Sequence, residues 1–225
     1  RSLDVTKNRS LEVLACGHNE LNENTNLTLR SLDVSKNTNL KVLVCNNNTL
    51  SSLDLDKNTN LEKLYCNGNP FSSLDLSKNT NLKVLDCRFN KLSSLDLTKN
   101  TNLEKLDCGH NSFSSLDFSK NTSLTYLVCQ ENAFLTSLNV TQNTSLEVLS
   151  CSHSKLSSLD ISANTDLEKL YCGFNSLNSL DVSKNINLEI LSCVYNDLSS
   201  LDLARNTSLK LLDCSENKLQ FLNIK

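Results

Sequence analysis

The chain has 225 residues, with 22 basic and 25 acidic side chains and a net charge of −3. This balance gives no electrostatic case for binding nucleic acid or an anionic membrane surface. No apolar run approaches the roughly 20 residues that span a bilayer, so we expect no membrane insertion. The chain contains no Met, so Arg1 is not a translation start, and we expect a processed or trimmed fragment.

Ten cysteines recur at nearly constant intervals along the whole chain. The intervals between successive cysteines are 29, 21, 21, 21, 21, 22, 21, 21 and 21 residues. A fixed period of this length indicates a solenoid, in which each repeat buries its apolar side only against its neighbours. No repeat boundary shows a change of composition or a linker. The sequence therefore predicts a single domain over residues 1–225.

Each repeat contains two similar halves. One half reads Leu-x-x-Leu-Asp-Leu-x-x-Asn, as at residues 50–58, and the other reads Leu-x-x-Leu-x-Cys-x-x-Asn, as at residues 61–69. The Leu-x-[Leu/Cys] step alternates between inward and outward positions, which is the period of a strand. Half-repeats this short leave no room for a full helix. We therefore predict about ten stacked turns of 21 residues, with two parallel sheets and little or no helix.

Two repeats are irregular, and the last one is incomplete. Extra residues in the first repeat predict an inserted loop near residues 22–29. A single extra residue predicts a local bulge around residues 134–138. The C-terminal segment, residues 219–225, stops within a repeat without a polar capping segment. Because solenoids need caps over their last apolar turn, we expect either a flanking domain that is missing from this chain or an adhesive end.

The motif Leu-x-x-Leu-x-[Leu/Cys]-x-x-Asn-x-[Leu/Phe] closely resembles the leucine-rich repeat. The nested form of about 21 residues is similar to the short bacterial class called IRREKO repeats, and the resemblance covers residues 3–224. It implies a right-handed superhelix whose parallel sheet binds a partner through its outward residues, without catalytic chemistry. It also implies an extracellular or cell-surface location. A cytoplasmic location stays open, because ten free thiols suit a reducing compartment.

The Cys and Asn columns are expected to be structural. Neighbouring parallel strands lie ~4.8 Å apart, whereas a disulfide needs Cβ atoms ~3.8 Å apart, so Cys in register should stay free and pack in the core. No Cys or His pair has the spacing of zinc ligands, and we expect neither metal nor cofactor. An inward Asn can bond to backbone groups that the corners leave unpaired. The residues chosen for these roles are Cys66, Cys87, Cys108, Asn48, Asn69, Asn90 and Asn111.

The two halves differ in how much they vary. The Leu-Asp-Leu half repeats Asp and Lys so regularly that a solvated, self-neutralising scaffold is favoured over a calcium-binding or ice-binding face. The Cys half varies at its outward strand position and at the two positions after Cys. A fixed framework with variable outward columns is typical of a binding surface. The predicted contact residues are Tyr65, Asp86, Arg88, Phe89, Asp107, His110, Tyr171, Phe174 and Tyr195, with Tyr171, Phe174 and Tyr195 as the central cluster.

The favoured hypothesis is a non-catalytic module that binds a protein partner, with a glycan as a further candidate. One alternative is a carbohydrate-active enzyme, because Asp86 and Asp107 on neighbouring turns could place their carboxyl groups ~5 Å apart, as in retaining glycosidases. Arg88 would neutralise that pair, and the face predicts no deep pocket. A second alternative is a structural or adhesive spacer, in which the variation has no function.

Overall fold

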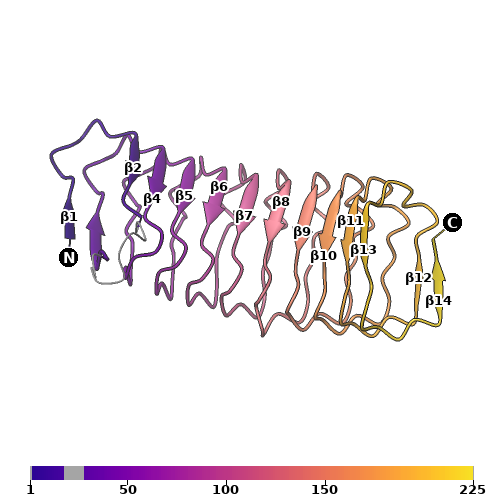
Figure 1. Cartoon of the computed structure of the whole chain (residues 1–225). Coiled ribbons are helices and arrows are strands. Elements are labelled where there is room, and N and C mark those ends of the chain that lie inside the picture. The colour runs from indigo at the N-terminus through magenta and orange to yellow at the C-terminus, as the bar shows by residue number, and fades with distance from the viewer. Residues whose placement is uncertain (1, 18–27, 225) are drawn as a thin grey trace.

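The computed structural model describes residues 2–17 and 28–224, which form a parallel β-solenoid (Figure 1). Within these ranges there are fourteen strands of three residues and no helix, so no helix is long and apolar enough to cross a membrane. The strands are β1 (Ser2–Asp4), β2 (Val13–Ala15), β3 (Ser31–Asp33), β4 (Val42–Val44), β5 (Lys63–Tyr65), β6 (Val84–Asp86), β7 (Lys105–Asp107), β8 (Tyr126–Val128), β9 (Val148–Ser150), β10 (Lys169–Tyr171), β11 (Ile190–Ser192), β12 (Ser200–Asp202), β13 (Leu211–Asp213) and β14 (Phe221–Asn223).

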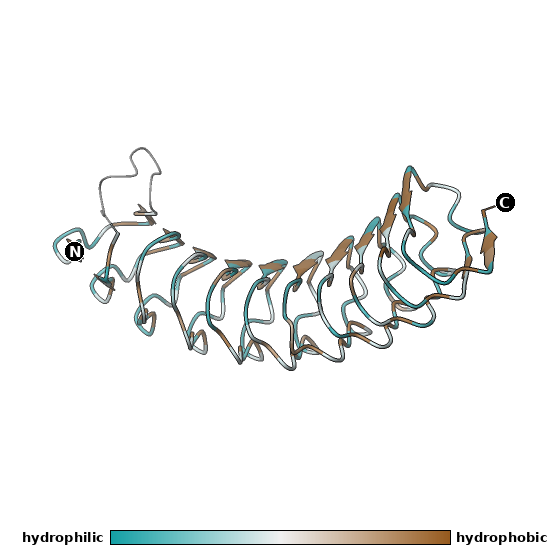
Figure 2. Cartoon of the chain, turned by 60° about the horizontal axis from the view of Figure 1, so that its bottom comes forward, coloured by the Kyte–Doolittle hydropathy of each residue, from teal (hydrophilic) through white to brown (hydrophobic). Residues whose placement is uncertain are grey.

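The Cys halves form one continuous sheet of ten parallel strands, in the order β13-β11-β10-β9-β8-β7-β6-β5-β4-β2. Equivalent residues of neighbouring repeats are paired, for example Asp86 with Asp107 and Tyr171 with Ser192. Figure 2 shows that the chain curves into an arc with this sheet on the inner side. We call the outward-facing residues of this sheet the inner face.

The Leu-Asp-Leu halves form the opposite wall, which is a sheet only in fragments. Strands β1 and β3 pair at one end, β12 and β14 pair at the other, and a single bridge joins Asn139 and Asp160 between them. The parallel-sheet solenoid without helix is confirmed, but the second sheet is less regular than the sequence predicts. The wall lies on the outer side of the arc (Figure 2). Its Asp side chains accept a hydrogen bond from the backbone N–H two residues later, as Asp75 does from Ser77 at 2.8 Å.

The Leu and Cys side chains fill the space between the two walls. Eight of the ten cysteines are buried, Cys16 and Cys214 are half-buried, and all ten are free thiols. Burial raises the pKa of the Cys45 thiol to about 12. These thiols pack as small apolar groups rather than as reactive ones.

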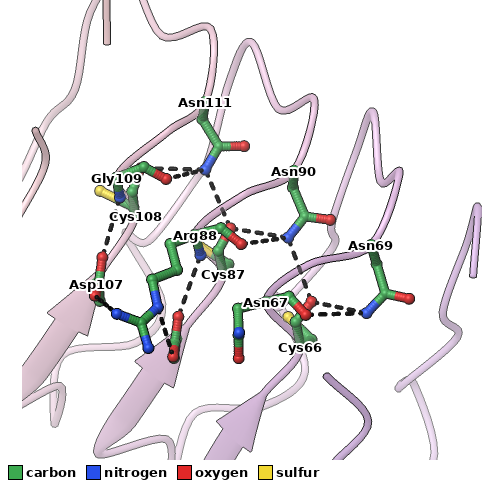
Figure 3. A network of polar contacts seen from close by, with 11 residues as sticks. Cys66, Asn67, Asn69, Cys87, Arg88, Asn90, Asp107, Cys108, Gly109 and Asn111 are labelled. Atoms are coloured by element: carbon green, nitrogen blue, oxygen red, sulfur yellow. Dashed lines mark hydrogen bonds and ion pairs between the residues drawn. The ribbon is translucent and has the colours of Figure 1, made fainter. Parts of the chain in front are cut away.

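The Asn column of the Cys half ties each rung to the one before it (Figure 3). The Asn111 amide nitrogen donates to the carbonyl oxygens of Cys87, Cys108 and Gly109, at 3.1 Å in each case, and its amide oxygen accepts from Leu92 N–H at 3.0 Å. Asn48, Asn69 and Asn90 make the equivalent bonds. Ser154 interrupts the column, and its buried hydroxyl oxygen has no hydrogen-bond partner within the described part of the chain.

The irregular segments are only partly described. Of the loop predicted near residues 22–29, residues 22–27 lie outside the described residues. At the second irregularity, Leu135 N–H donates to the Asn132 carbonyl at 2.9 Å, and the Phe134 side chain is exposed. At the C-terminal rung the side chains of Leu211, Phe221 and Leu222 are exposed.

Candidate binding face

The inner face carries two outward columns, because the central Leu of each strand points into the core. The first column is Val13, Val42, Lys63, Val84, Lys105, Tyr126, Val148, Lys169, Ile190 and Leu211. The second column is Ala15, Val44, Tyr65, Asp86, Asp107, Val128, Ser150, Tyr171, Ser192 and Asp213. Sequence reasoning identified only the second column as variable and outward, although the same alternation applies to both.

A third column, the corner column, follows the sheet at the second residue after each Cys. Its described members are Asn47, Gly68, Phe89, His110, Glu131, His153, Phe174, Tyr195 and Glu216, and all have a left-handed backbone, with φ between 51° and 56° for the non-glycine residues. The N–H of Phe174 donates to the Val194 carbonyl of the next rung at 2.8 Å, and other members repeat this bond. The ladder of the sheet therefore continues through the corner and holds each member one rung from the next.

Left-handed backbone is costly for most side chains, by about 1 kcal/mol or more, and Asn and Gly tolerate it best. Asn47 and Gly68 fit that requirement, and histidine, at His110 and His153, is also enriched there, but Phe89, Phe174 and Tyr195 carry large aromatic rings. Such strain persists only where the surrounding structure holds it, and it concentrates at functional sites. The preference of residue types for this backbone therefore does not explain why the large aromatic rings occur here.

The rings of the corner column form two stacks. Phe89 and His110 stack with centroids 4.0 Å apart. In the second stack, His153 and Phe174 are 4.1 Å apart, and Phe174 and Tyr195 are 4.6 Å apart. Phe89, Phe174 and Tyr195 are 53%, 40% and 50% exposed. The two stacks give the edge of the inner face a rigid, solvent-exposed aromatic surface.

A charged cluster of Asp86, Arg88 and Asp107 lies on the same two rungs as the first stack, and Figure 3 shows Arg88 reaching toward Asp107. The Arg88 guanidinium group is 3.3 Å from the Asp86 carboxylate and 3.4 Å from the Asp107 carboxylate. Burial raises the pKa of Asp86 to about 6, against the lowering effect of Arg88, and Asp107 raises it further. The pKa of Asp107 is also raised by burial. The cluster is a partly buried ion network in which one cation serves two carboxylates.

The raised pKa of Asp86 predicts that Asp86→Asn gains stability relative to the unmodified chain as pH rises from 4 to 7. Between about pH 4 and pH 6 the folded chain binds this proton more tightly than the unfolded chain, so folding stability falls as pH rises through that window. Urea unfolding at four pH values measures the difference. Asp75→Asn is the control, because the pKa of Asp75 is lowered by its bonds to Ser77. A difference for Asp86→Asn that does not change with pH would contradict the prediction.

The inner face is hollowed over strands β7 to β11, in a shallow depression of about 500 Å³. Its floor includes Val128, Val148 and Ser150, and its rim includes Asp107, Tyr126, Glu131, His153, Tyr171 and Phe174. The Gln130 side chain accepts a hydrogen bond from the Ser150 hydroxyl at 2.9 Å. The depression is open, and it offers polar, charged and aromatic groups together.

The structure places the sequence-predicted residues in two groups on one face. One group is Asp86, Arg88, Phe89, Asp107 and His110, which lie on two neighbouring rungs. In the other group, Tyr171 and Phe174 line the depression, and Tyr195 lies on the next rung. Tyr65, on β5, is one rung before Asp86 and does not line the depression.

Sequence reasoning did not select Tyr126, Glu131 or His153, which line the depression between the groups. The signal was available for Tyr126, which lies at an outward strand position. Within the described ranges, no group of three or more His, Cys, Asp or Glu residues is arranged to hold a metal ion.

A family model for leucine-rich repeats in two copies matches residues 38–79, 59–99 and 80–121. No match to the chain was found among curated protein sequences. Among solved structures, the chain is similar to the functional domain of InlJ from Listeria monocytogenes, which includes a cysteine ladder. That similarity has 33% identity and a TM-score of 0.90, and covers 100% of this chain and 55% of that one.

Two more distant structures share the fold. The internalin InlF from Listeria monocytogenes has 23% identity and a TM-score of 0.79, with 84% of this chain and 62% of that chain covered. YopM from Yersinia enterocolitica has 25% identity and a TM-score of 0.66, with 88% and 46% covered. The chain thus spans roughly half to two thirds of the length of these solved structures.

Proposed function

Because this chain is a leucine-rich repeat protein, we propose that it is a non-catalytic recognition module that binds a protein partner on its inner face. Repeat solenoids use their extended concave surfaces for binding. The observation that carries the proposal is the corner column, where exposed rings occupy strained backbone positions in two stacks. Rigid aromatic side chains are the usual energetic centres of interfaces.

The charged cluster supports binding better than catalysis. The Arg88 guanidinium contacts both carboxylates of the Asp86–Asp107 pair, so neither is a free nucleophile or acid. The depression beside them is open rather than enclosed. A partly buried, hydrogen-bonded ion network of this kind gives a binding surface charge selectivity.

We extend the proposal to an extracellular or cell-surface location, on the resemblance to bacterial leucine-rich repeats. The free thiols do not oppose it. Burial raises the pKa of the thiols along the whole column, including half-buried Cys16 and Cys214. Oxidation proceeds through the thiolate, so a column of protonated, buried thiols can persist in an oxidising compartment.

Partner capture from a native lysate or host extract tests the proposal. The immobilised chain should retain a specific protein, and the variant with Tyr171→Ser, Phe174→Ser and Tyr195→Ser should not. Unchanged capture would favour the spacer alternative. Protease treatment of the extract should abolish capture, whereas periodate treatment that abolishes it would indicate a glycan.

A turnover screen on acidic and neutral polysaccharides tests the enzyme alternative. We expect no activity. Activity that is lost in Asp86→Asn would overturn the proposal.

A further inference from the structure

Two departures from the repeat occur on neighbouring rungs of the Cys half, and the hydrogen bonds link them. In the regular rungs the amide oxygen of each Asn accepts the N–H of the residue 19 positions earlier, at 2.8 to 3.2 Å in eight cases. The same spacing pairs Leu135 with Ser154, whose hydroxyl oxygen has no partner within the described part of the chain. Leu135 N–H donates instead to the Asn132 carbonyl of its own turn, at 2.9 Å.

The extra residue of the 22-residue repeat explains this change of acceptor. A regular corner of the Cys half reads Asn-x-[Leu/Phe], as at residues 111–113, whereas residues 132–135 read Asn-Ala-Phe-Leu. The longer spacing is that of the corners that follow the opposite wall, which read Asn-x-x-Leu. Those corners close on themselves in the same way, as Leu124 N–H does on the Asn121 carbonyl at 3.2 Å. We call residues 132–135 the closed turn.

The opposite wall also shows what such a corner requires of the next rung. There nine Asn amide oxygens, from Asn37 to Asn206, are buried and have no hydrogen-bond partner within the described ranges. A corner that closes on itself therefore needs no acceptor from the side chain of the next rung. This explains how the column tolerates Ser154, because the shorter side chain leaves the buried Leu135 with its N–H still bonded.

The same arrangement loosens the junction between the two rungs. A regular Asn joins its rung to the preceding one through two side-chain bonds, as Asn175 does with Leu156 N–H and with the Cys151 carbonyl, at 3.0 Å each. Ser154 makes neither bond within the described part of the chain. What remains is the backbone ladder of the sheet, which is unbroken between β8 and β9.

We propose that the extra residue and Ser154 form one compensated unit, in which the closed turn opens locally without separating the rungs on either side. A bond inside a turn can break by the motion of that turn alone, whereas a bond between rungs breaks only when the rungs move apart. Glu131 and His153, the corner residues of these two rungs, line the depression. The loosened junction therefore lies at the rim of the candidate binding face.

Native-state hydrogen exchange of the intact chain, read by NMR, tests the local opening. The Leu135 amide should have a protection factor at least about tenfold lower than the amides of Phe113 and Leu156, which occupy the same corner position and are held by Asn132 and Asn175. Its exchange rate should also stay nearly constant at low urea concentrations, because local opening exposes little surface. Equal protection of the three amides would overturn the inference.

Deletion of Ala133, alone and with Ser154→Asn, tests the compensation. The deletion restores the 21-residue spacing and leaves the buried Leu135 N–H without an acceptor while residue 154 is serine. It should therefore raise the equilibrium constant for urea unfolding at least about tenfold, as expected for an unpaired buried donor. In the Ser154→Asn background the same deletion should change that constant less than about threefold, because asparagine supplies the acceptor, as Asn132 does for Phe113.

The reciprocal change on the preceding rung is the matched control. Asn132→Ser removes the acceptor of Phe113 N–H and should destabilise the chain. An alanine inserted between Asn111 and Ser112 should recover at least about fivefold of the loss in the unfolding constant, because it lets that corner close on itself. An equal cost of the Ala133 deletion in both backgrounds, or no recovery by the inserted alanine, would overturn the inference. The proposed function would stand in either case, because partner capture tests it separately.

Discussion

Replacing Asn111 by alanine is expected to lower the free energy of unfolding by about 3 kcal/mol. The change removes three donated hydrogen bonds and one accepted bond. The carbonyls of Cys87 and Cys108 keep bonds from the neighbouring Asn90 and Asn132 side chains, but the buried Leu92 N–H loses its partner. One unpaired buried donor costs 1–3 kcal/mol, and each lost bond adds about 1 kcal/mol or less.

Two further substitutions, measured by chemical denaturation, provide free energies of unfolding with which the loss in Asn111→Ala is compared. Asn102→Ala is the matched control on the same turn, because its exposed side chain donates one bond, to the Thr80 carbonyl at 3.1 Å, and it should cost less than about 1 kcal/mol. Asn111→Ser reproduces the natural interruption at Ser154 and should lie between the two. Equal losses for Asn111→Ala and Asn102→Ala would show that the Asn column does not hold the rungs together.

Replacing Phe174 or Tyr195 by asparagine is expected to weaken binding of the captured partner at least about tenfold each, as for residues at the centre of an interface. The same changes should alter stability by less than about 1 kcal/mol. Asparagine relieves the left-handed backbone strain, as at Asn47 in the same column, and this gain offsets the loss of ring stacking. Titration calorimetry and urea unfolding measure the two effects separately.

The control for this pair is Ile186→Asn. Ile186 is an exposed apolar residue, 54% accessible, and it lies in the turn after the buried Asn185, outside the strands of the inner face. Its replacement should leave partner affinity unchanged. If Phe174→Asn and Tyr195→Asn destabilised the chain by several kcal/mol and bound the partner normally, the rings would be structural, and their strained positions would have no relation to recognition.

The period of the cysteines was sufficient to predict the solenoid, the parallel strands and the inward Asn column, because these features depend on residues that hardly change between repeats. The fragmentary second sheet was not predictable, since its Leu-Asp-Leu motif alternates like a strand. The chain curves with this wall on the outer side (Figure 2), and that curvature is a property of the stacked repeats that the motif of one repeat does not reveal.

The sequence predicted which face carries the candidate site, but not how the side chains are arranged on it. The variable residues after each Cys mark the corner column, yet Phe and Tyr give no sequence signal of a left-handed backbone. Stacking between residues 21 positions apart depends on the register of the rungs. The same register places Glu131 between the two stacks.

The central claim is that the partner binds the inner face, and one matched comparison tests it most directly. Ser192→Trp adds bulk to the inner face on β11, and Ser179→Trp adds the same bulk to the opposite wall in the same repeat. We expect the affinity of the captured partner to fall at least about tenfold for Ser192→Trp and to stay unchanged for Ser179→Trp. If Ser192→Trp bound the partner with normal affinity and Ser179→Trp lost affinity, the partner would bind the opposite wall, which would contradict the claim.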